Sequence, residues 1–177
     1  RTLVRALLQN SRDQRLDDRP VRVRFTLQTL EGEALTDFLD ALNWPSLEAH
    51  IRGAIEEGGP LAPNLRMALQ EIGSGRLKIL AVEDGNGLGL VGGEDEPHAN
   101  FNSLCRNVLD SGSDRPGRGG SFGLGKAVLW RFSSLSTVLF SSLPSDEPSG
   151  KLRLFGRSEL PGHATRSGLW EGPGWFG

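Results

Sequence analysis

The chain has 177 residues, of which 37% are hydrophobic, and this is enough for one α/β domain with its own core. Its 20 Lys and Arg nearly balance 22 Asp and Glu, so any contact with nucleic acid would have to be local. The single cysteine, Cys105, excludes an internal disulfide framework and a multi-cysteine zinc site, and it favours a reducing, cytoplasmic location. No apolar run of about 18 residues predicts a membrane span. The only methionine is Met67, which indicates a fragment of a longer protein.

The first part of the chain predicts a helix, a strand and a helical insert. Residues 2–14 carry leucines at helical spacing, and Pro20 follows. Residues 21–27 (VRVRFTL) alternate apolar with polar, which predicts a half-buried strand with four apolar side chains on one face: Val21, Val23, Phe25 and Leu27. Residues 35–70 contain helical pieces separated by turn signals at 43–45 and 58–60, with Ser46 as an expected N-cap.

The second part predicts strands around a long loop. Residues 76–82 (RLKILAV) predict a buried strand that ends at a polar glycine run. Residues 90–120 predict a loop, with a short helix around 101–109, of the kind that is usually a lid or disordered. A helix is expected after Gly125, followed by a hairpin of strands 136–142 and 151–157. The tail from residue 161 has no assignable fold.

Two segments suit a purine nucleotide and its metal. Asp84, at a strand end, can accept the exocyclic amino proton of adenine, and Gly87 allows the backbone to approach the ring. The amide oxygen of Asn10, projecting from the first helix, is a hard ligand suited to Mg²⁺, which takes its other oxygens from water and phosphates.

A third segment suits phosphate. Glycines at the start of a helix expose N–H groups at the positive end of the helix dipole, and this assigns Gly123 and Gly125 to phosphate oxygens. Lys126 adds a positive charge. The same residues 120–126 (GSFGLGK) also fit the GxxxxGK spacing of a P-loop, but Ala127 stands where a P-loop needs Ser or Thr.

In order and context, these segments resemble the motifs of the GHKL, or Bergerat-fold, ATPase superfamily, whose members include gyrases, heat-shock chaperones, histidine kinases and MutL-like proteins. The matching stretches read LVRALLQNSRD, ILAVEDGNGLG and GGSFGLGKAV, between Leu3 and about Ser142. The resemblance implies an α/β two-layer sandwich with helices on one face of a mixed sheet. It implies a single ATP-binding domain over residues 1–177, with a helical insert at about 35–70 and an ATP lid at about 90–120.

The resemblance also implies which residues contact Mg²⁺ and ATP, and what the partners are. The expected nucleotide-binding residues are Asn10, Asp13, Asp84, Gly85, Gly87, Gly89, Gly120, Ser121, Phe122, Gly123, Leu124, Gly125 and Lys126, with Asn10 also bound to the metal. In many relatives lid closure is coupled to ATP-dependent homodimerisation, and a downstream domain or partner protein completes the site. Association with nucleic acid is a weaker expectation, and a membrane partner is not expected.

The chain departs from the family at Ala6, because relatives place a glutamate there as the general base that activates water. Without that base, hydrolysis should fall by about 10²- to 10⁴-fold while binding persists. Two explanations are open: a natural non-catalytic ATP sensor, or a deliberate glutamate-to-alanine substitution that traps bound ATP. We favour the second. A histidine-kinase-like phosphotransfer domain is a further alternative, although no helix with a phospho-acceptor histidine precedes these motifs.

The remaining residues with chemical potential have simpler interpretations. His50, His98 and His163 show no metal-ligand spacing and are expected to be solvated or structural. Cys105 is expected to be a small buried side chain, and three tryptophans, Trp44, Trp130 and Trp175, are expected to pack. Arg115 and Arg118 in the expected lid are the remaining candidates for phosphate contact.

Overall fold

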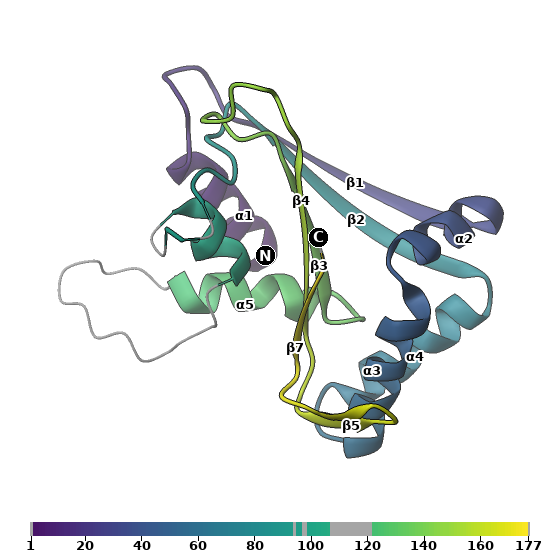
Figure 1. Cartoon of the computed structure of the whole chain (residues 1–177). Helices are drawn as coiled ribbons and strands as arrows, with labels where there is room; N and C mark the ends of the chain where they lie inside the picture. Colours follow the sequence, from purple (N-terminus) through teal and green to yellow (C-terminus); the bar gives the residue numbers. More distant parts are fainter. Residues whose placement is uncertain (1, 94, 97–98, 107–121, 177) are drawn as a thin grey trace.

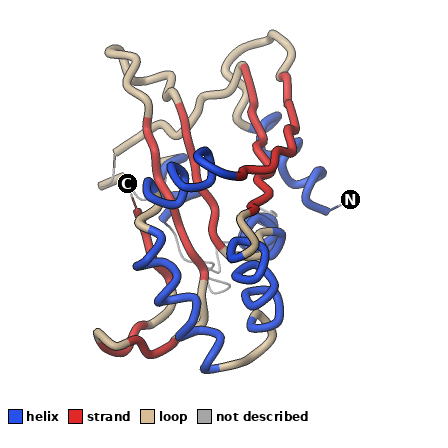
Figure 2. Tube along the Cα trace, turned by 90° about the vertical axis from the view of Figure 1, so that its right-hand side faces the viewer, coloured by secondary structure: helices blue, strands red, loops and turns tan. Residues whose placement is uncertain are grey.

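A computed structural model describes residues 2–93, 95–96, 99–106 and 122–176. The chain combines helices with small antiparallel sheets (Figures 1 and 2). The helices are α1 (Thr2–Asp13), α2 (Gly32–Ala41), α3 (Trp44–Glu57), α4 (Ala62–Gly73), the π-helix η1 (Asn102–Arg106) and α5 (Phe122–Phe132). The strands are β1 (Arg22–Glu31), β2 (Arg76–Gly85), β3 (Thr137–Ser142), β4 (Arg153–Glu159), β5 (His163–Thr165), β6 (Gly168–Trp170) and β7 (Pro173–Phe176).

The strands form three sheets, and the expected single mixed sheet is not what the described residues show. β1 pairs with β2, β3–β4–β7 form a second sheet in that order, and β5 pairs with β6. Every pairing is antiparallel. A parallel pair of strands needs a crossover connection, and the connection through α5, between β2 and β3, is the candidate. However, β2 and β3 are not neighbours in any sheet. The mixed α/β composition is therefore as expected, while the sheet is divided.

The helical insert is where the main core lies. α2, α3 and α4 confirm the expected helices, separated by Asn43 with φ of 49° and by a glycine pair with positive φ. Asn43, and not Ser46, occupies the N-cap of α3. Leu47, Ile51 and Leu65 of the insert are buried together with Leu77 of β2 and with two leucines that flank the other sheet, Leu135 just before β3 and Leu160 just after β4. The insert thus joins the β1–β2 pair to the other sheet.

The face of β1 that the alternating pattern marked as buried is largely exposed. Phe25 is 39% exposed and Leu27 is 70% exposed. The opposite face of the pair carries Leu30 and Leu77, which pack against the insert. The alternation correctly predicted a strand. Both faces of the β1–β2 pair carry apolar side chains, however, and the helices of the insert cover the face of Leu30 and Leu77. None of the described helices is long and apolar enough to cross a membrane.

A second layer packs on the β3–β4–β7 sheet. Trp130 of α5 is buried against it, donating its indole N–H to the carbonyl oxygen of Arg157 at 3.0 Å. Phe101, just before η1, meets Phe155 of β4 edge-on. α1 lies against α5 (Figure 1). Cys105 of η1 is fully buried, as expected for a small packing side chain.

Candidate functional site

The end of α1 is hydrogen-bonded to the glycine turn that follows Asp84. The backbone N–H of Leu88 donates to the carbonyl oxygen of Gln14 at 2.8 Å, and that of Leu16 donates to the carbonyl oxygen of Asn86 at 3.0 Å. Arg15 and Gly87 form a short antiparallel bridge between the two segments. The residues that directly follow the predicted segment of α1 are therefore in contact with the glycine turn of a second predicted segment.

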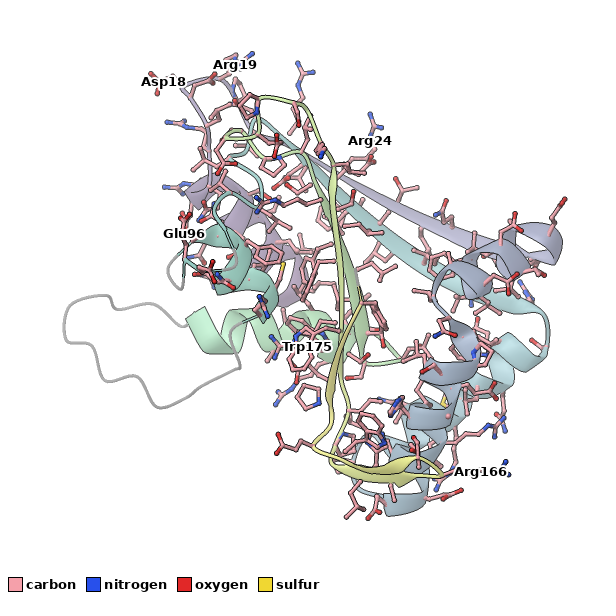
Figure 3. All side chains as sticks on the ribbon, viewed as in Figure 1. Asp18, Arg19, Arg24, Glu96, Arg166 and Trp175 are labelled. Atoms are coloured by element: carbon pink, nitrogen blue, oxygen red, sulfur yellow. The ribbon has the colours of Figure 1, made fainter. Side chains whose placement is uncertain are left out.

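Asn86 shapes this turn. Its φ is 67°, in the left-handed region that asparagine tolerates better than most residues, and its side-chain amide donates to the carbonyl oxygen of Arg19 at 2.7 Å. Arg19, labelled in Figure 3 beside Asp18, in turn donates from Nε to a carboxylate oxygen of Asp17 at 2.9 Å. This bond lowers the pKa of Asp17 to about 2, together with hydrogen bonds from the backbone N–H of Arg19 and from the side chain of Asn86. The loop after α1 is thereby tied to the turn.

The residues after the turn are also fixed, from the other side. The N–H of Leu90 donates to the hydroxyl of Ser142 at 2.9 Å, and Arg153 donates to the carbonyl oxygen of Leu90 at 2.8 Å. The N–H of Gly92 donates to a carboxylate oxygen of Asp146 at 2.9 Å. Leu90 itself is buried. The β3–β4 hairpin therefore holds residues 90–92, which the sequence had placed at the start of the lid.

Asn100 connects the end of α1, the turn and the described part of the expected lid. Its amide donates to the side chain of Gln14 at 2.6 Å and to the carbonyl oxygen of Gly89 at 3.1 Å. The neighbouring Asn102, which is buried, donates to the carbonyl oxygens of Gly93 and Glu96. Residues 99–106 of the expected lid are packed in this way, and η1 lies within the short helix expected around 101–109, of which residues 107–109 lie outside the described residues.

The glycines of the turn serve different purposes. A Cβ placed on Gly87 would lie 3.9 Å from both carboxylate oxygens of Asp84, so the absence of a side chain keeps the space beside that carboxylate open. Gly89 has φ of 72°, and a Cβ there would come within 2.6 Å of the Ser142 hydroxyl. A Cβ on Gly85 would meet nothing within 4 Å. Gly89 is therefore needed by the fold, Gly87 borders the carboxylate, and Gly85 is under neither constraint.

Asp84 lies within β2 and not after it, as the penultimate residue of the strand, and it pairs with Val23 of β1. Its side chain is exposed, whereas residues 79–82 of β2 are half-buried and Leu77 is buried. The carboxylate is thus an accessible hydrogen-bond acceptor held at the end of a rigid strand. Such a group can accept an N–H or O–H from a ligand that reaches the turn.

On α1, the predicted residues divide between two faces. Ala6 and Asn10 are half-buried, one helical turn apart, whereas Asp13 is exposed. A hollow of about 870 Å³ opens on the exposed face, and its described lining comprises Val4, Arg5, Leu8, Gln9, Arg12 and Asp13. Asn10 and Asp84 are not among those described lining residues, so the hollow does not join the two candidate nucleotide contacts.

The glycine segment at the start of α5 is described only in part. The helix begins at Phe122, so its first five residues are Phe122, Gly123, Leu124, Gly125 and Lys126. Gly120 and Ser121 lie outside the described residues, as do Arg115, Arg118 and His98. The contact between α1 and α5 brings this helix to the same side of the molecule as the turn (Figure 1).

Sequence reasoning missed the residues that hold the site together. Asn86 had a local signal, because an Asn-Gly pair favours positive φ. Gln14, Asn100 and Arg153 had none, since each acts on a segment far away in the chain. Within the part of the chain that is described, no cluster of three or more His, Cys, Asp or Glu side chains could hold a metal ion by itself.

Comparison with protein-family models gives no match, and comparison with curated proteins and with solved structures gives no significant match.

Proposed function

We propose that this chain is a Mg²⁺-dependent ATP-binding module of the GHKL type, with a Bergerat-like arrangement of motifs. The observation that carries the proposal is the pair of hydrogen bonds between the end of α1 and the turn after Asp84. They bring together two segments whose residue types suit adenine and Mg²⁺, and α5, with the phosphate-type glycines, lies against the same helix. Three weak motifs thus become neighbours around α1.

In this proposal Asp84 receives the exocyclic amino group of adenine. The side chain is exposed at the end of β2, and Gly87 leaves the space next to it free. The bonds from Gln14, Leu16 and Asn100 hold the turn in place before any ligand arrives. A preformed acceptor loses little entropy on binding, which favours affinity and selection for a purine with an amino group.

Mg²⁺ would be held chiefly by the nucleotide. Among the described residues, no group of three or more His, Cys, Asp or Glu side chains could hold the ion. Mg²⁺ can take most of its ligands from phosphate oxygens and water, and it then needs only one or two oxygens from the protein. Asn10 would add one amide oxygen, the glycines at the start of α5 would offer N–H groups to the phosphates, and Lys126 would add a positive charge.

Hydrolysis of ATP should be slow because Ala6 stands where a general base would be needed. Ala6 lies one turn before Asn10 on the same half-buried face of α1, where a carboxylate would lie close to the metal ligand. Alanine cannot accept a proton, so we propose that the chain binds ATP and hydrolyses it slowly. A natural ATP sensor with the same site is the second candidate.

Calorimetric titration with Mg²⁺-ATP tests the proposal, using this chain and Asp84→Asn. We expect binding to the unchanged chain and affinity about 10- to 100-fold weaker in the variant, since a hydrogen bond to a charged acceptor contributes about 1.5–3 kcal/mol. Glu83→Gln is the matched control, because this neighbouring carboxylate points to the opposite face of the β1–β2 pair, 3.8 Å from Arg24. Equal affinity in the chain and the Asp84 variant, or no binding to either, would contradict the proposal.

A further inference from the structure

The β5–β6 hairpin packs on α3 through two histidines. Nδ1 of His50, on α3, lies 2.9 Å from Nε2 of His163, the first residue of β5. His163 is 4% exposed, and its Nδ1 lies 2.8 Å from the carbonyl oxygen of Pro161. The indole of Trp170, on β6, meets the His50 ring edge-on with centroids 4.8 Å apart. The histidine pair therefore lies inside the contact between hairpin and helix.

The two backbones are in close contact beside the pair. A Cβ on Gly53 of α3 would lie 2.2 Å from the carbonyl oxygen of Ala164 and 2.9 Å from the ring of His163. The hairpin is therefore seated directly on the helix, and the two rings have little freedom to rearrange while it stays there.

The hydrogen bonds assign the protons of the neutral pair. A carbonyl oxygen can only accept, so Nδ1 of His163 carries the hydrogen that points to Pro161. In a neutral imidazole the other nitrogen is then an acceptor, so Nε2 of His163 receives a hydrogen from Nδ1 of His50. Both histidines are thus in the Nδ1–H form when the hairpin is docked and the pair is neutral.

The docked pair can take up one proton but not two. With one added proton, His163 carries N–H on both nitrogens and donates from Nε2, while His50 now carries its hydrogen on Nε2 instead of Nδ1 and accepts at Nδ1. With a second proton, two N–H groups on two cations would face each other across 2.9 Å. Once the hairpin leaves α3, both rings are free to ionise.

The surrounding charges do not offset this repulsion. On α3, Glu48 pairs with Arg52 one turn away. On the hairpin, Arg166 lies at the exposed tip (Figure 3), and Glu171 is exposed. The pKa of His50 is lowered by burial and, second, by the charge of His163.

Opening can be confined to the hairpin. Glu159 of β4 pairs with Pro173 of β7, so the two ends of residues 160–172 are held together by the neighbouring sheet. The hairpin can therefore leave α3 without unpairing β7, as a local opening of a small unit.

We propose that the His50–His163 pair is a proton-sensitive latch that holds the β5–β6 hairpin on α3 near neutral pH and releases it in acid. The released state binds one more proton than the docked state, so docking is strongest above an ordinary histidine pKa of about 6.5. Below that pH the docking equilibrium constant falls about tenfold per pH unit. The latch is independent of nucleotide binding.

Amide hydrogen exchange of residues 162–171, corrected for the intrinsic pH dependence of exchange, tests the latch between pH 7.5 and 5. We expect opening of the hairpin to increase about tenfold per unit below pH 6.5 in the unchanged chain. His50→Gln should lose this dependence and stay docked, because a glutamine amide can donate or accept without ionising. Arg166→Gln, a change at the exposed tip of the hairpin that leaves both histidines in place, should behave as the unchanged chain.

Nitrogen NMR of the imidazoles gives a second measurement that needs no variant. Both His50 and His163 should show the Nδ1–H form at pH 7.5. The latch is overturned if hairpin exchange in the unchanged chain is independent of pH, if His50→Gln keeps the pH dependence, if Arg166→Gln abolishes it, or if both rings are in the Nε2–H form.

Discussion

Leu88 donates its backbone N–H to the carbonyl oxygen of Gln14, just beyond the last residue of α1, at 2.8 Å. Carbonyl groups at the end of a helix lack partners within the helix, and here a turn from the far end of β2 supplies one. The same turn carries Asp84, so the contact that closes α1 also fixes the position of the candidate adenine acceptor. Changes to the turn should therefore affect stability and the candidate site together.

Gly89→Ala should destabilise the fold by about 2 kcal/mol or more. The residue has φ of 72°, and its new Cβ would approach the Ser142 hydroxyl at 2.6 Å and the backbone of residues 143 and 144 at 3.1 to 3.2 Å. Gly85→Ala is the matched control, with open space around it, and should change stability by about 0.5 kcal/mol at most. Urea unfolding of the three proteins measures the difference, and equal losses for both variants would contradict the assigned role of Gly89.

The sequence predicted the elements whose signals are local. α1, the three insert helices and the β3–β4 hairpin follow from periodicity and turn residues that lie within a few positions of one another. The buried face of β1 did not follow, because Phe25 and Leu30 are equally apolar and the choice between their faces is made by the insert. Local patterns cannot predict which face a distant helix covers.

The strands of the tail and the long-range contacts of the site were not predicted, for a related reason. β5 and β6 have three residues each, too few for a periodic signal, and they are held by α3. His50 and His163 were expected to be solvated or structural, and their hydrogen bond makes them structural, but the pairing itself is not visible in the sequence. Asn100 likewise acts through Gln14 and Gly89, and nothing next to it in the chain marks it.

Arg157→Leu should cost about 3–5 kcal/mol of stability. The guanidinium is 1% exposed, donates to the carbonyl oxygen of Cys105 at 2.9 Å, lies over the Trp130 ring and forms an ion pair with Glu159. Removing it leaves the Glu159 carboxylate, 19% exposed, without this counter-charge, and that loss dominates the cost.

Chemical denaturation of Arg157→Leu, Glu159→Leu and the double variant measures the coupling of this pair. The double variant should lose less than the sum of the two single variants, because it leaves no buried charge alone. Arg24→Leu removes an exposed partner of Glu83 and should cost less than about 1 kcal/mol. Additive losses at Arg157 and Glu159 would show that the ion pair contributes nothing.

Asp17 should titrate near pH 2, well below the ordinary aspartate pKa of 3.8, because Arg19 and Asn86 donate hydrogen bonds to its charged form. A depressed folded-state pKa adds stability above the unfolded pKa, and this is lost as pH falls from about 4 to about 2. Carbon NMR of the carboxyl group measures the midpoint. Arg19→Ala removes the largest cause and should raise the pKa towards 3.8, whereas Arg22→Ala, nearby on β1, should leave it unchanged.

Ala6→Glu should increase ATP turnover by about 10²- to 10⁴-fold, the range that a positioned general base contributes. The position is half-buried, which disfavours a charged carboxylate and raises its pKa towards the range that suits proton abstraction near neutral pH. Ala6→Gln matches the size of glutamate without its basicity and should stay as slow as the unchanged chain. Steady-state phosphate release, measured at saturating Mg²⁺-ATP, separates the two open explanations. Turnover in Ala6→Glu alone supports a site from which the base was removed, whereas unchanged turnover despite retained ATP binding supports a natural sensor in which the nucleotide acts only by shifting conformation.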